Sequence, residues 1–485
     1  MIHNMKTMSN RLRFILLLML AVTATACSKS EVSLFEVPSQ SILLTKPGES
    51  GSTTFDTHNI TSIKVTSKPA GWSVDSIDMY TGTISVTAPS SFDNDEATEG
   101  DISLTGYTPT GSVKTLTIYV AILPHNDIDF TSTPANCYVV FQADRRYKFN
   151  PYVGGNNTAL ATEKVELVWQ SSKDLIKYLD LRDGVASFYV ESAVDENDTP
   201  TNEVTPGNAV IAARNSDGEI IWSWHIWITT TDPTLDIATL NGKTMMNRNL
   251  GANCNSEGEA NEEKIMQSYG LYYQWGNKNP LPGPQRWDFH GNSDAALYNY
   301  ANKEYSLKYA DNTAECGTEE WSTAHPAYII LGNANNSYDW LYNSHDDSLW
   351  NGTSKSEQDP CPAGWRLPDS SIFASLDIRT ADDDMAWQEA QKMYGWHLED
   401  RTTGESYFFA AAGRRNYLDG KLDIMNDDAT RPVPWSGYYW TTTTDGDNGV
   451  ALYFDLNTES RTWNGMNTSR SMHRANALPV RCIRE

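Results

Sequence analysis

Eight residues carry the strongest structural signal in this chain: Cys361-Pro362-Ala363-Gly364-Trp365-Arg366-Leu367-Pro368. They are matched at the C-terminus by Val480-Arg481-Cys482-Ile483-Arg484-Glu485. Between these segments lie Tyr438-Tyr439-Trp440-Thr441-Thr442 and the alternating run Val450-Ala451-Leu452-Tyr453-Phe454-Asp455. Short runs rich in aromatic and β-branched residues predict strands. The last third of the chain is therefore expected to end in a set of strands.

Together these segments closely resemble the Fibrobacter succinogenes major paralogous (FISUMP) domain. Met245 to Gly251 and Gly270 to Gly276 also match openings of this family. The resemblance covers roughly residues 241–485, about half of the chain. It implies a C-type-lectin-like fold, which mostly presents binding loops and rarely catalyses.

The N-terminus predicts export. Lys6, Arg11 and Arg13 precede an apolar core of nine residues, 14–22. That core is too short to cross about 30 Å of hydrocarbon as a helix, so residues 1–26 are expected to be a signal peptide. Ala24-Thr25-Ala26-Cys27 resembles a bacterial lipobox, which implies a lipidated Cys27 followed by a tether, 27–32.

This pattern predicts a lipid-anchored protein of the outer membrane. Its one early acid, Glu31, only partly resembles the surface-export signals of Bacteroidota lipoproteins. Both the cell surface and the periplasmic face therefore stay open. The alternative is an ordinary signal peptide with a chance cysteine.

An exported protein meets an oxidising environment, which favours disulfides. Cys361–Cys482 is the strongest predicted pair, because it joins the middle of the C-terminal domain to its last strand, and C-type-lectin-like folds carry a comparable bridge. Cys254–Cys316 is expected as a second, weaker pair. Cys137 is left over and sits in an apolar strand, so we expect a buried thiol rather than a partner-seeking one.

Before the resemblance begins, the chain is strand-rich. Residues 33–123 contain short alternating runs separated by Gly-, Pro- and Asp-rich turns, which predicts a β-sandwich. This region loosely resembles BACON domains. Residues 129–230 predict a second β-sandwich, and the C-terminal domain is expected over 236–485. The predicted fold is therefore mostly β, with two tandem sandwiches followed by an α+β, C-type-lectin-like domain.

The run Ile220 to Ile228 closes the second predicted sandwich. A strand has a period of two, so Trp222, Trp224, Ile226 and Ile228 are expected on one face. Ser223, His225 and Trp227 are expected on the other. His225 is predicted to be a satisfied interface histidine, because no second metal-type residue is patterned with it.

Charge and motifs exclude several functions. The chain has 37 basic and 62 acidic residues and a net charge of −25, which argues against a nucleic-acid partner. Catalytic motifs for zinc proteases or serine hydrolases are absent. Asp445 to Gly449 resembles part of a calcium loop but lacks the terminal Glu, so a hairpin turn is expected. Formylglycine-generating enzymes share the broader fold and need a cysteine pair near the end, where this chain has only Cys482. We expect no metal, no cofactor and no enzyme.

Aromatic residues supply the candidate binding positions. The sequence contains 16 Trp and 24 Tyr, which either fill cores and turns or present flat faces to sugar rings. Residues 281–358 have little apolar periodicity but many aromatics, so packed loops are expected there. The ligand-binding candidates are Trp287, Trp321, Trp340, Trp350 and Trp463. At least two of the first four are expected to be exposed on one side of the domain.

The leading functional hypothesis is a lipid-anchored binding protein of the cell envelope. Its expected partner is a glycan, or an envelope or host protein, bound by loops of the C-terminal domain. The alternative is a structural pilus-tip or envelope-assembly component without a small ligand. Burial of all four tryptophans would favour that alternative.

Overall fold

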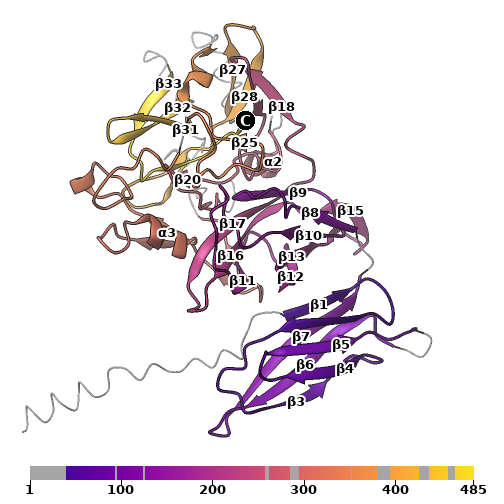
Figure 1. Ribbon diagram of the computed structural model, residues 1–485. Helices are drawn as coiled ribbons and strands as arrows, with labels where there is room; N and C mark the ends of the chain where they lie inside the picture. The colour runs from indigo at the N-terminus through magenta and orange to yellow at the C-terminus, as the bar shows by residue number, and fades with distance from the viewer. Residues whose placement is uncertain are drawn as a thin grey trace, which may run out of the picture. The chain divides into compact units, whose positions relative to one another are not determined.

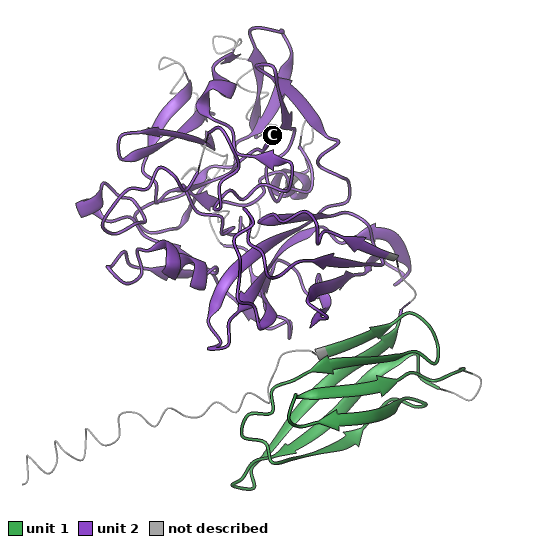
Figure 2. Ribbon diagram, in the orientation of Figure 1, with its two compact units in different colours: residues 1–122 green, residues 123–485 purple. Residues whose placement is uncertain are grey.

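The computed structural model describes residues 40–92, 96–123, 126–256, 261–284, 294–350, 352–378, 394–424, 436–456 and 465–485. Three residues singled out in the sequence, Cys27, Trp287 and Trp463, lie outside these ranges. The chain divides into two compact units, residues 1–122 and 123–485 (Figure 2). The fold is mostly β, as predicted. Within the described ranges, no helix is long and apolar enough to cross a membrane.

Unit 1 is a β-sandwich of a four-stranded and a three-stranded sheet. The sheet orders are β1-β7-β6-β3 and β2-β5-β4. The strands are β1 Gln40–Leu44, β2 Ser50–Thr54, β3 Ser62–Ser67, β4 Ser73–Asp78, β5 Thr83–Thr87, β6 Glu99–Tyr107 and β7 Val113–Ile122. Trp72 anchors the core between the sheets, and its indole N–H donates to the Ala97 carbonyl at 2.8 Å. The alternating runs at 63–65, 84–86, 102–104 and 113–122 form strands as predicted.

Unit 2 begins with a second β-sandwich. Its strands are β8 Asn126–Asp129, β9 Cys137–Val140, β10 Arg145–Phe149, β11 Lys164–Gln170, β12 Lys177–Arg182, β13 Val185–Val190, β14 Ser192–Val194, β15 Pro200–Val204, β16 Gly207–Arg214 and β17 Ile220–Ile228. One sheet has the order β12-β13-β10-β8, and the other is six-stranded with the order β22-β21-β11-β16-β17-β9. The two strands at one edge of the larger sheet, β21 Leu297–Tyr298 and β22 Glu304–Tyr305, come from the C-terminal segment.

Strand β17 is buried on both faces. Trp222, Trp224, Ile226 and Ile228 lie in the sandwich core, as the period of two predicted. Trp227 packs instead into a second core shared with residues of the C-terminal segment. His225 is also buried on this second face, where its Nε2 lies 2.8 Å from Asn208 Oδ1. The expected satisfied interface histidine is confirmed.

The C-terminal segment consists of short strands and long connections (Figure 1). Its first elements are β18 Ile237–Leu240, β19 Lys243–Met246, α2 Glu262–Gln267, β20 Tyr273–Gln274, β23 Lys308–Ala310, α3 Glu319–Ala324, β24 Tyr328–Ile330 and the 3-10 helix η1 Ala334–Asn336. They are followed by β25 Trp365–Arg366, the 3-10 helix η2 Ser370–Phe373, β26 Leu376–Asp377, β27 Gly395–Asp400, β28 Ser406–Ala410, β29 Arg414–Arg415, β30 Leu422–Asp423, β31 Ser436–Asp445, β32 Asn448–Asp455, β33 Met466–Met472, β34 Ala477–Leu478 and β35 Ile483–Arg484. The sheets are β18-β19-β35-β25, β20-β34-β29-β30, β26-β27-β28, β31-β32-β33 and the pair β23-β24.

The predicted second sandwich and C-terminal domain share one core. That core combines Cys137, Trp169 and Trp227 of the sandwich with residues of the C-terminal segment such as Trp275 and Trp440. The ranges 129–230 and 236–485, predicted as two domains, therefore form one compact unit. The reason is the second apolar face of β17, which needs a partner outside its own sandwich.

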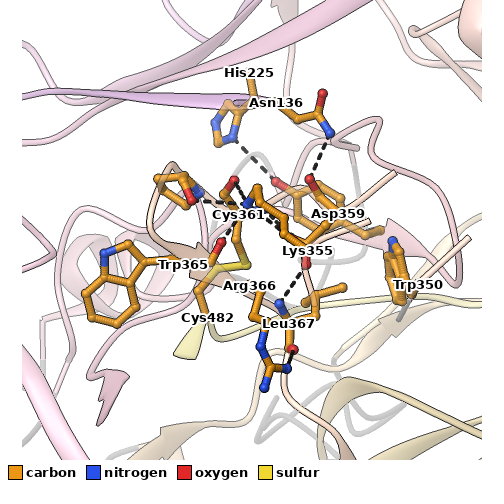
Figure 3. Close-up of a disulfide and its surroundings, with 12 residues drawn as sticks. Asn136, His225, Trp350, Lys355, Asp359, Cys361, Trp365, Arg366, Leu367 and Cys482 are labelled. Carbon is orange, nitrogen blue, oxygen red and sulfur yellow. Dashed lines mark hydrogen bonds and ion pairs between the residues drawn. A yellow bond between two sulfur atoms is a disulfide. The ribbon is translucent and has the colours of Figure 1, made fainter. Parts of the chain in front are cut away.

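The disulfide Cys361–Cys482 forms as predicted, across a sequence separation of 121. Figure 3 shows the polar groups that hold its surroundings. The two carboxylate oxygens of Asp359 accept the backbone N–H groups of Cys361 and Leu367, each at 2.8 Å. The Lys355 ammonium donates to the carbonyls of Cys361 and Trp365, each at 2.6 Å. The C-terminal strand is thus tied to a rigid loop.

The predicted Cys254–Cys316 pair is wrong. Cys254 Sγ lies 3.4 Å from the Lys264 carbonyl, in the segment before α2. Cys316 instead packs against a cluster that contains Trp340. Cys254 and Cys316 are therefore not joined to each other by a disulfide. Cys137 is a buried thiol, as expected, and burial raises its pKa.

Asp369 caps a 3-10 helix that ends at Phe373, and its carboxylate accepts the Ser371 backbone N–H at 2.9 Å. Asp445 and Asn448 pair at the turn between β31 and β32, which confirms the hairpin expected there. Within the described residues, no group of three or more His, Cys, Asp or Glu side chains is placed to hold a metal ion.

Candidate functional site

A groove with a volume of about 940 Å³ lies in unit 2, between helix α3 and the hairpin formed by β16 and β17. Figure 1 shows α3 beside these strands, and α3 packs directly on β17. The residues that line the groove are Arg214, Glu219, Ile220, Ile221, Glu315, Thr318, Glu319, Glu320, Trp321, Thr323, Ala324 and His325. Trp321, one of the predicted ligand-binding residues, lines this groove.

The aromatic platform of the groove is a stack of two rings. The imidazole of His325 lies on the indole of Trp321, with ring centroids 3.9 Å apart and an angle of 13° between the planes. Tyr328 meets both rings edge-on, at 5.2 Å and 5.4 Å. Offset and edge-to-face contacts of this kind are favourable arrangements for aromatic rings. The three side chains fix one another's orientation, and each is only partly buried.

Local sequence explains why the platform forms. Thr318 caps α3 by accepting the Trp321 backbone N–H at 3.0 Å, and Glu319 and Glu320 occupy the first turn, where the helix dipole favours acids. His325 ends the helix, and its Nδ1 donates to the Trp321 carbonyl at 2.8 Å. Because positions i and i+4 lie on the same helix face, the imidazole of His325 stacks on the indole of Trp321.

A buried polar network holds α3 against β17. Ser322 on α3 receives a hydrogen bond from Asn277 at 2.7 Å, and its carbonyl receives one from Asn279 at 2.8 Å. Lys278 lies between these two asparagines, and its ammonium donates to Ser223 Oγ at 2.7 Å and to the Ser223 carbonyl at 2.9 Å. The ammonium also lies 4.4 Å from the ring centre of Trp222.

Burial lowers the pKa of Lys278 to about 7, although Glu357 and Glu319 act in the opposite direction. A buried ammonium without a carboxylate in direct contact is expensive. Its three donor contacts, to the Ser223 carbonyl, Ser223 Oγ and Asn279 Oδ1, fix the register between α3 and β17, so the position of the platform depends on this lysine.

The groove has a strongly acidic character. Among its lining residues, Glu219, Glu315, Glu319 and Glu320 make no ion pair with any described residue. Arg214 is the only cation of fixed charge in the lining, and it pairs with Glu166 outside the groove at 2.5 Å. Burial raises the pKa of Glu319, while a hydrogen bond from Gln358 opposes this. The arrangement repels anions and offers carboxylate acceptors to hydroxyl or amine groups beside a flat aromatic surface.

Trp340 and Trp350 are not among the exposed tryptophans that were expected in this set of four, since both are 1% exposed. The Trp340 indole donates to the Trp275 carbonyl at 2.7 Å, and that of Trp350 donates to the Gln358 carbonyl at 2.8 Å. Their N–H groups and their apolar surface are satisfied internally, so they act as packing residues. Trp287 and Trp463 lie outside the described residues. Trp321 is the one described candidate that lines the groove.

Sequence reasoning missed the other groove residues. His325 follows Trp321 by four positions, a spacing that would have placed both on one helix face if α3 had been recognised. Arg214 and Glu219 flank the Asp217-Gly218 turn, but nothing local connects that turn to α3 across a sequence separation of about 100 residues. The contact between α3 and this hairpin forms only in the tertiary structure.

No family model and no curated protein matches the chain. Among solved structures, SporoSAG from Toxoplasma gondii is similar at 11% identity and a TM-score of 0.13, covering 40% of this chain and 96% of that one. The protocadherin GammaB4 extracellular domain has 16% identity, a TM-score of 0.14 and coverage of 40% and 31%. SGBP-B of a Bacteroides ovatus mixed-linkage glucan utilization locus, solved with a mixed-linkage heptasaccharide, has 11% identity, a TM-score of 0.12 and coverage of 40% and 46%. At these TM-scores the similarities assign neither a family nor a function to the chain.

Proposed function

We propose that this chain is a non-catalytic binding protein of the cell envelope, and that the groove beside α3 takes up a segment of a glycan. The observation that carries the proposal is the Trp321–His325 stack at the edge of an open groove. A flat aromatic surface matches the apolar face of a sugar ring, and the surrounding carboxylates and Thr hydroxyls match its hydroxyl groups. The acidic lining disfavours anionic glycans.

The resemblance to the FISUMP domain supports the same proposal. It implies a C-type-lectin-like fold whose loops present binding surfaces, and α3 lies within one of the long connections of that segment. The volume of the groove, about 940 Å³, is at the upper end of the range for ligand sites and so suits a ligand of several sugar units better than a single small molecule.

A glycan-array screen of residues 28–485 tests the proposal, followed by titration calorimetry on the best neutral ligand. Trp321→Ala is expected to weaken binding at least tenfold. Since Trp321 also packs against the Trp340 cluster, Thr323→Arg provides a second variant that blocks the groove without removing a core contact. Tyr152→Ala, which truncates an aromatic residue of unit 2 that is 38% exposed, is the matched control. Binding that survives both groove variants would overturn the assignment of the site.

A specific observation favours the structural alternative, a pilus-tip or envelope-assembly component. Trp340 and Trp350 are both buried, so these two tryptophans of the long connections pack the protein interior and are not available to a ligand. In that case the array shows no ligand, while affinity capture from envelope fractions recovers a defined protein partner that Thr323→Arg does not release.

The proposed location rests on the sequence of the N-terminus. Cys27→Ser is expected to abolish lipidation and to move the protein from the membrane fraction to the soluble fraction. Fractionation and blotting measure this directly. An equal membrane-bound share for variant and wild type would remove the lipid anchor from the proposal.

A further inference from the structure

The carboxylates of the groove beside α3 lie on both of its walls. Glu219 belongs to the turn between β16 and β17, whereas Glu319 and Glu320 lie in the first turn of α3. Glu315 lies in the segment just before that helix. All four residues are exposed to solvent. A ligand in the groove therefore meets negative charge from either side.

Arg214 does not neutralise these carboxylates. It is the one guanidinium in the lining, and it donates a hydrogen bond to Glu166, which lies outside the groove. The Lys278 ammonium is buried, and its hydrogen bonds go to Ser223 and Asn279. Both cations are thus engaged elsewhere, and the lining keeps an excess of negative charge.

Further acids add to the negative charge around α3. Burial raises the pKa of Glu319, and the carboxylates of Glu357 and Asp346 raise it further, while a hydrogen bond from Gln358 and the charge of Lys278 act in the opposite direction. Like charges held close together disfavour each other's ionised form. A cation bound in the groove relieves this repulsion, and a neutral ligand does not. The electrostatics of the groove therefore favour a positively charged ligand.

The carboxylates do not gather around one point. Among the residues with described positions, no three His, Cys, Asp or Glu side chains are placed to hold a metal ion. Divalent cations such as calcium need several oxygen ligands around one centre. A ligand that carries separate positive charges along its length suits this arrangement better than a metal ion does.

The aromatic platform is an independent feature that favours the same kind of ligand. Trp321 lines the groove, and a cation within about 6 Å of the centre of an indole ring is attracted by its π-electrons. Ile220 and Ile221 add apolar surface on the wall formed by the hairpin. The groove thus combines aromatic and apolar surface for sugar rings with acceptors for positively charged groups.

Building on the glycan-binding function proposed above, we infer that the ligand of this groove is an oligosaccharide of amino sugars whose amino groups are free. Such a chain has an apolar C–H face and one ammonium group on each ring. The rings stack on Trp321, while the ammonium groups lie between Glu219 on one wall and Glu320 on the other. An acetylated chain lacks this match because an acetamide is neutral, and a sulfated chain is repelled.

Three hexasaccharides with the same β-1,4 backbone provide the test, because they differ only in the group on carbon 2 of each ring. Hexaglucosamine carries ammonium groups, hexa-N-acetylglucosamine carries acetamides and cellohexaose carries hydroxyls. In titration calorimetry on residues 28–485 at about pH 6 and low salt, where the amines are protonated, hexaglucosamine is expected to bind at least about tenfold more tightly than either of the others. Because salt screens exposed charges, this preference is expected to shrink at about 0.5 M NaCl.

Matched variants distinguish the groove from the acidic surface of the whole protein, which has a net charge of −25. Glu219→Gln combined with Glu320→Gln removes one carboxylate from each wall and is expected to weaken hexaglucosamine binding about three- to tenfold. Glu196→Gln combined with Glu203→Gln removes the same charge from exposed positions outside the groove. This second pair is expected to leave the affinity unchanged.

The outcomes distinguish the ligand class from the glycan-binding function. If cellohexaose or hexa-N-acetylglucosamine binds as tightly as hexaglucosamine and is lost on Thr323→Arg, the groove remains a glycan site and the amino-sugar assignment is overturned. Equal weakening by the two pairs of Glu→Gln changes shows attraction to the acidic surface at large and also overturns the assignment. If none of the three binds, the assignment is wrong, and an empty glycan array then removes the glycan-binding function as well.

Discussion

The imidazole of His325 covers the indole of Trp321 at a centroid distance of 3.9 Å, and its Nδ1 is hydrogen-bonded to the carbonyl of that same tryptophan. His325 thus contacts Trp321 twice, through the indole ring and through the backbone carbonyl. The consequence is a tryptophan at the groove that has few rotamers to lose when a ligand stacks on it. Rigid aromatic anchors of this kind contribute much of the binding energy at recognition sites.

His325→Ala is therefore expected to weaken ligand binding at the groove about three- to tenfold. Without the imidazole, the Trp321 side chain is more mobile and loses more conformational entropy when the ligand binds. Titration calorimetry with the ligand from the glycan array measures the effect. His473→Ala is the control, since His473 also packs against aromatic rings, those of Tyr338 and Tyr417, but does not line the groove. Equal losses for the two variants would show that the stack does not preorganise the site.

Lys278 should give unit 2 a characteristic pH dependence. Its pKa is about 7 in the folded protein and 10.5 in the unfolded reference. Between these values the unfolded state binds the proton and the folded state does not, so the unfolding free energy rises with pH, by up to about 1.4 kcal/mol per pH unit. Below pH 7 both states are charged and the slope from this group vanishes.

Lys278→Met removes the group that causes this slope. Thermal melts at pH 7 and pH 9 are expected to show the wild type gaining stability relative to Lys278→Met as the pH rises. Lys421→Met, a change at an exposed lysine, supplies the control and should follow the wild type. Parallel pH profiles for wild type and Lys278→Met would show that the lysine is charged or hydrated in the folded protein.

Several of these features follow from local sequence, and others do not. The two faces of β17 were predictable, because the period of two is a property of every strand. The Cys361–Cys482 bridge followed from the family resemblance. Burial of Trp340 and Trp350 depends on carbonyl acceptors from other segments, and composition alone cannot identify those.

The core that the second sandwich shares with the C-terminal segment illustrates the same limit. The position of Trp169 depends on a bulge in its pairing with β16, so the regular alternation of its own strand predicts the wrong face. The contact between α3 and β17 is also non-local. Recognition sites assembled from distant segments require the tertiary structure, whereas the strands that carry them can be read from periodicity.

The Cys361–Cys482 disulfide leads to a prediction for unit 2, for which unit 1 serves as the control within the same protein. Cys361 and Cys482 close a loop of 121 residues, for which chain entropy assigns about 4–5 kcal/mol of stabilisation, although measured values are often smaller. The replacement of both cysteines by Ala is expected to lower the melting temperature of unit 2. Residues 40–122 of unit 1 contain no cysteine, so its transition should not move under reducing conditions. Calorimetry with and without reductant measures both transitions, and an unchanged unit 2 would show that the bridge contributes little.

Asn136 tests whether the second sandwich and the C-terminal segment unfold together. Its amide nitrogen donates to the carbonyls of Glu357 and Asp359, at 2.6 Å and 2.8 Å, and its oxygen accepts the Trp222 indole N–H at 3.2 Å. Asn136 is 2% exposed, so Asn136→Ala leaves three buried polar groups without their partner, at a cost of about 1–3 kcal/mol or more.

A glycine next to Asn136 offers an independent route to the same defect. A Cβ at Gly155 would lie 2.3 Å from Asn136 Oδ1, so Gly155→Ala must displace the Asn136 side chain. Both variants are expected to destabilise unit 2 in urea while preserving a single transition for it, because the sandwich and the C-terminal segment share one core. Asn335→Ala, at an exposed position, is the control. Two separate transitions within residues 123–485 of either variant would show instead that the sandwich and the C-terminal segment are independent domains that merely touch at Asn136.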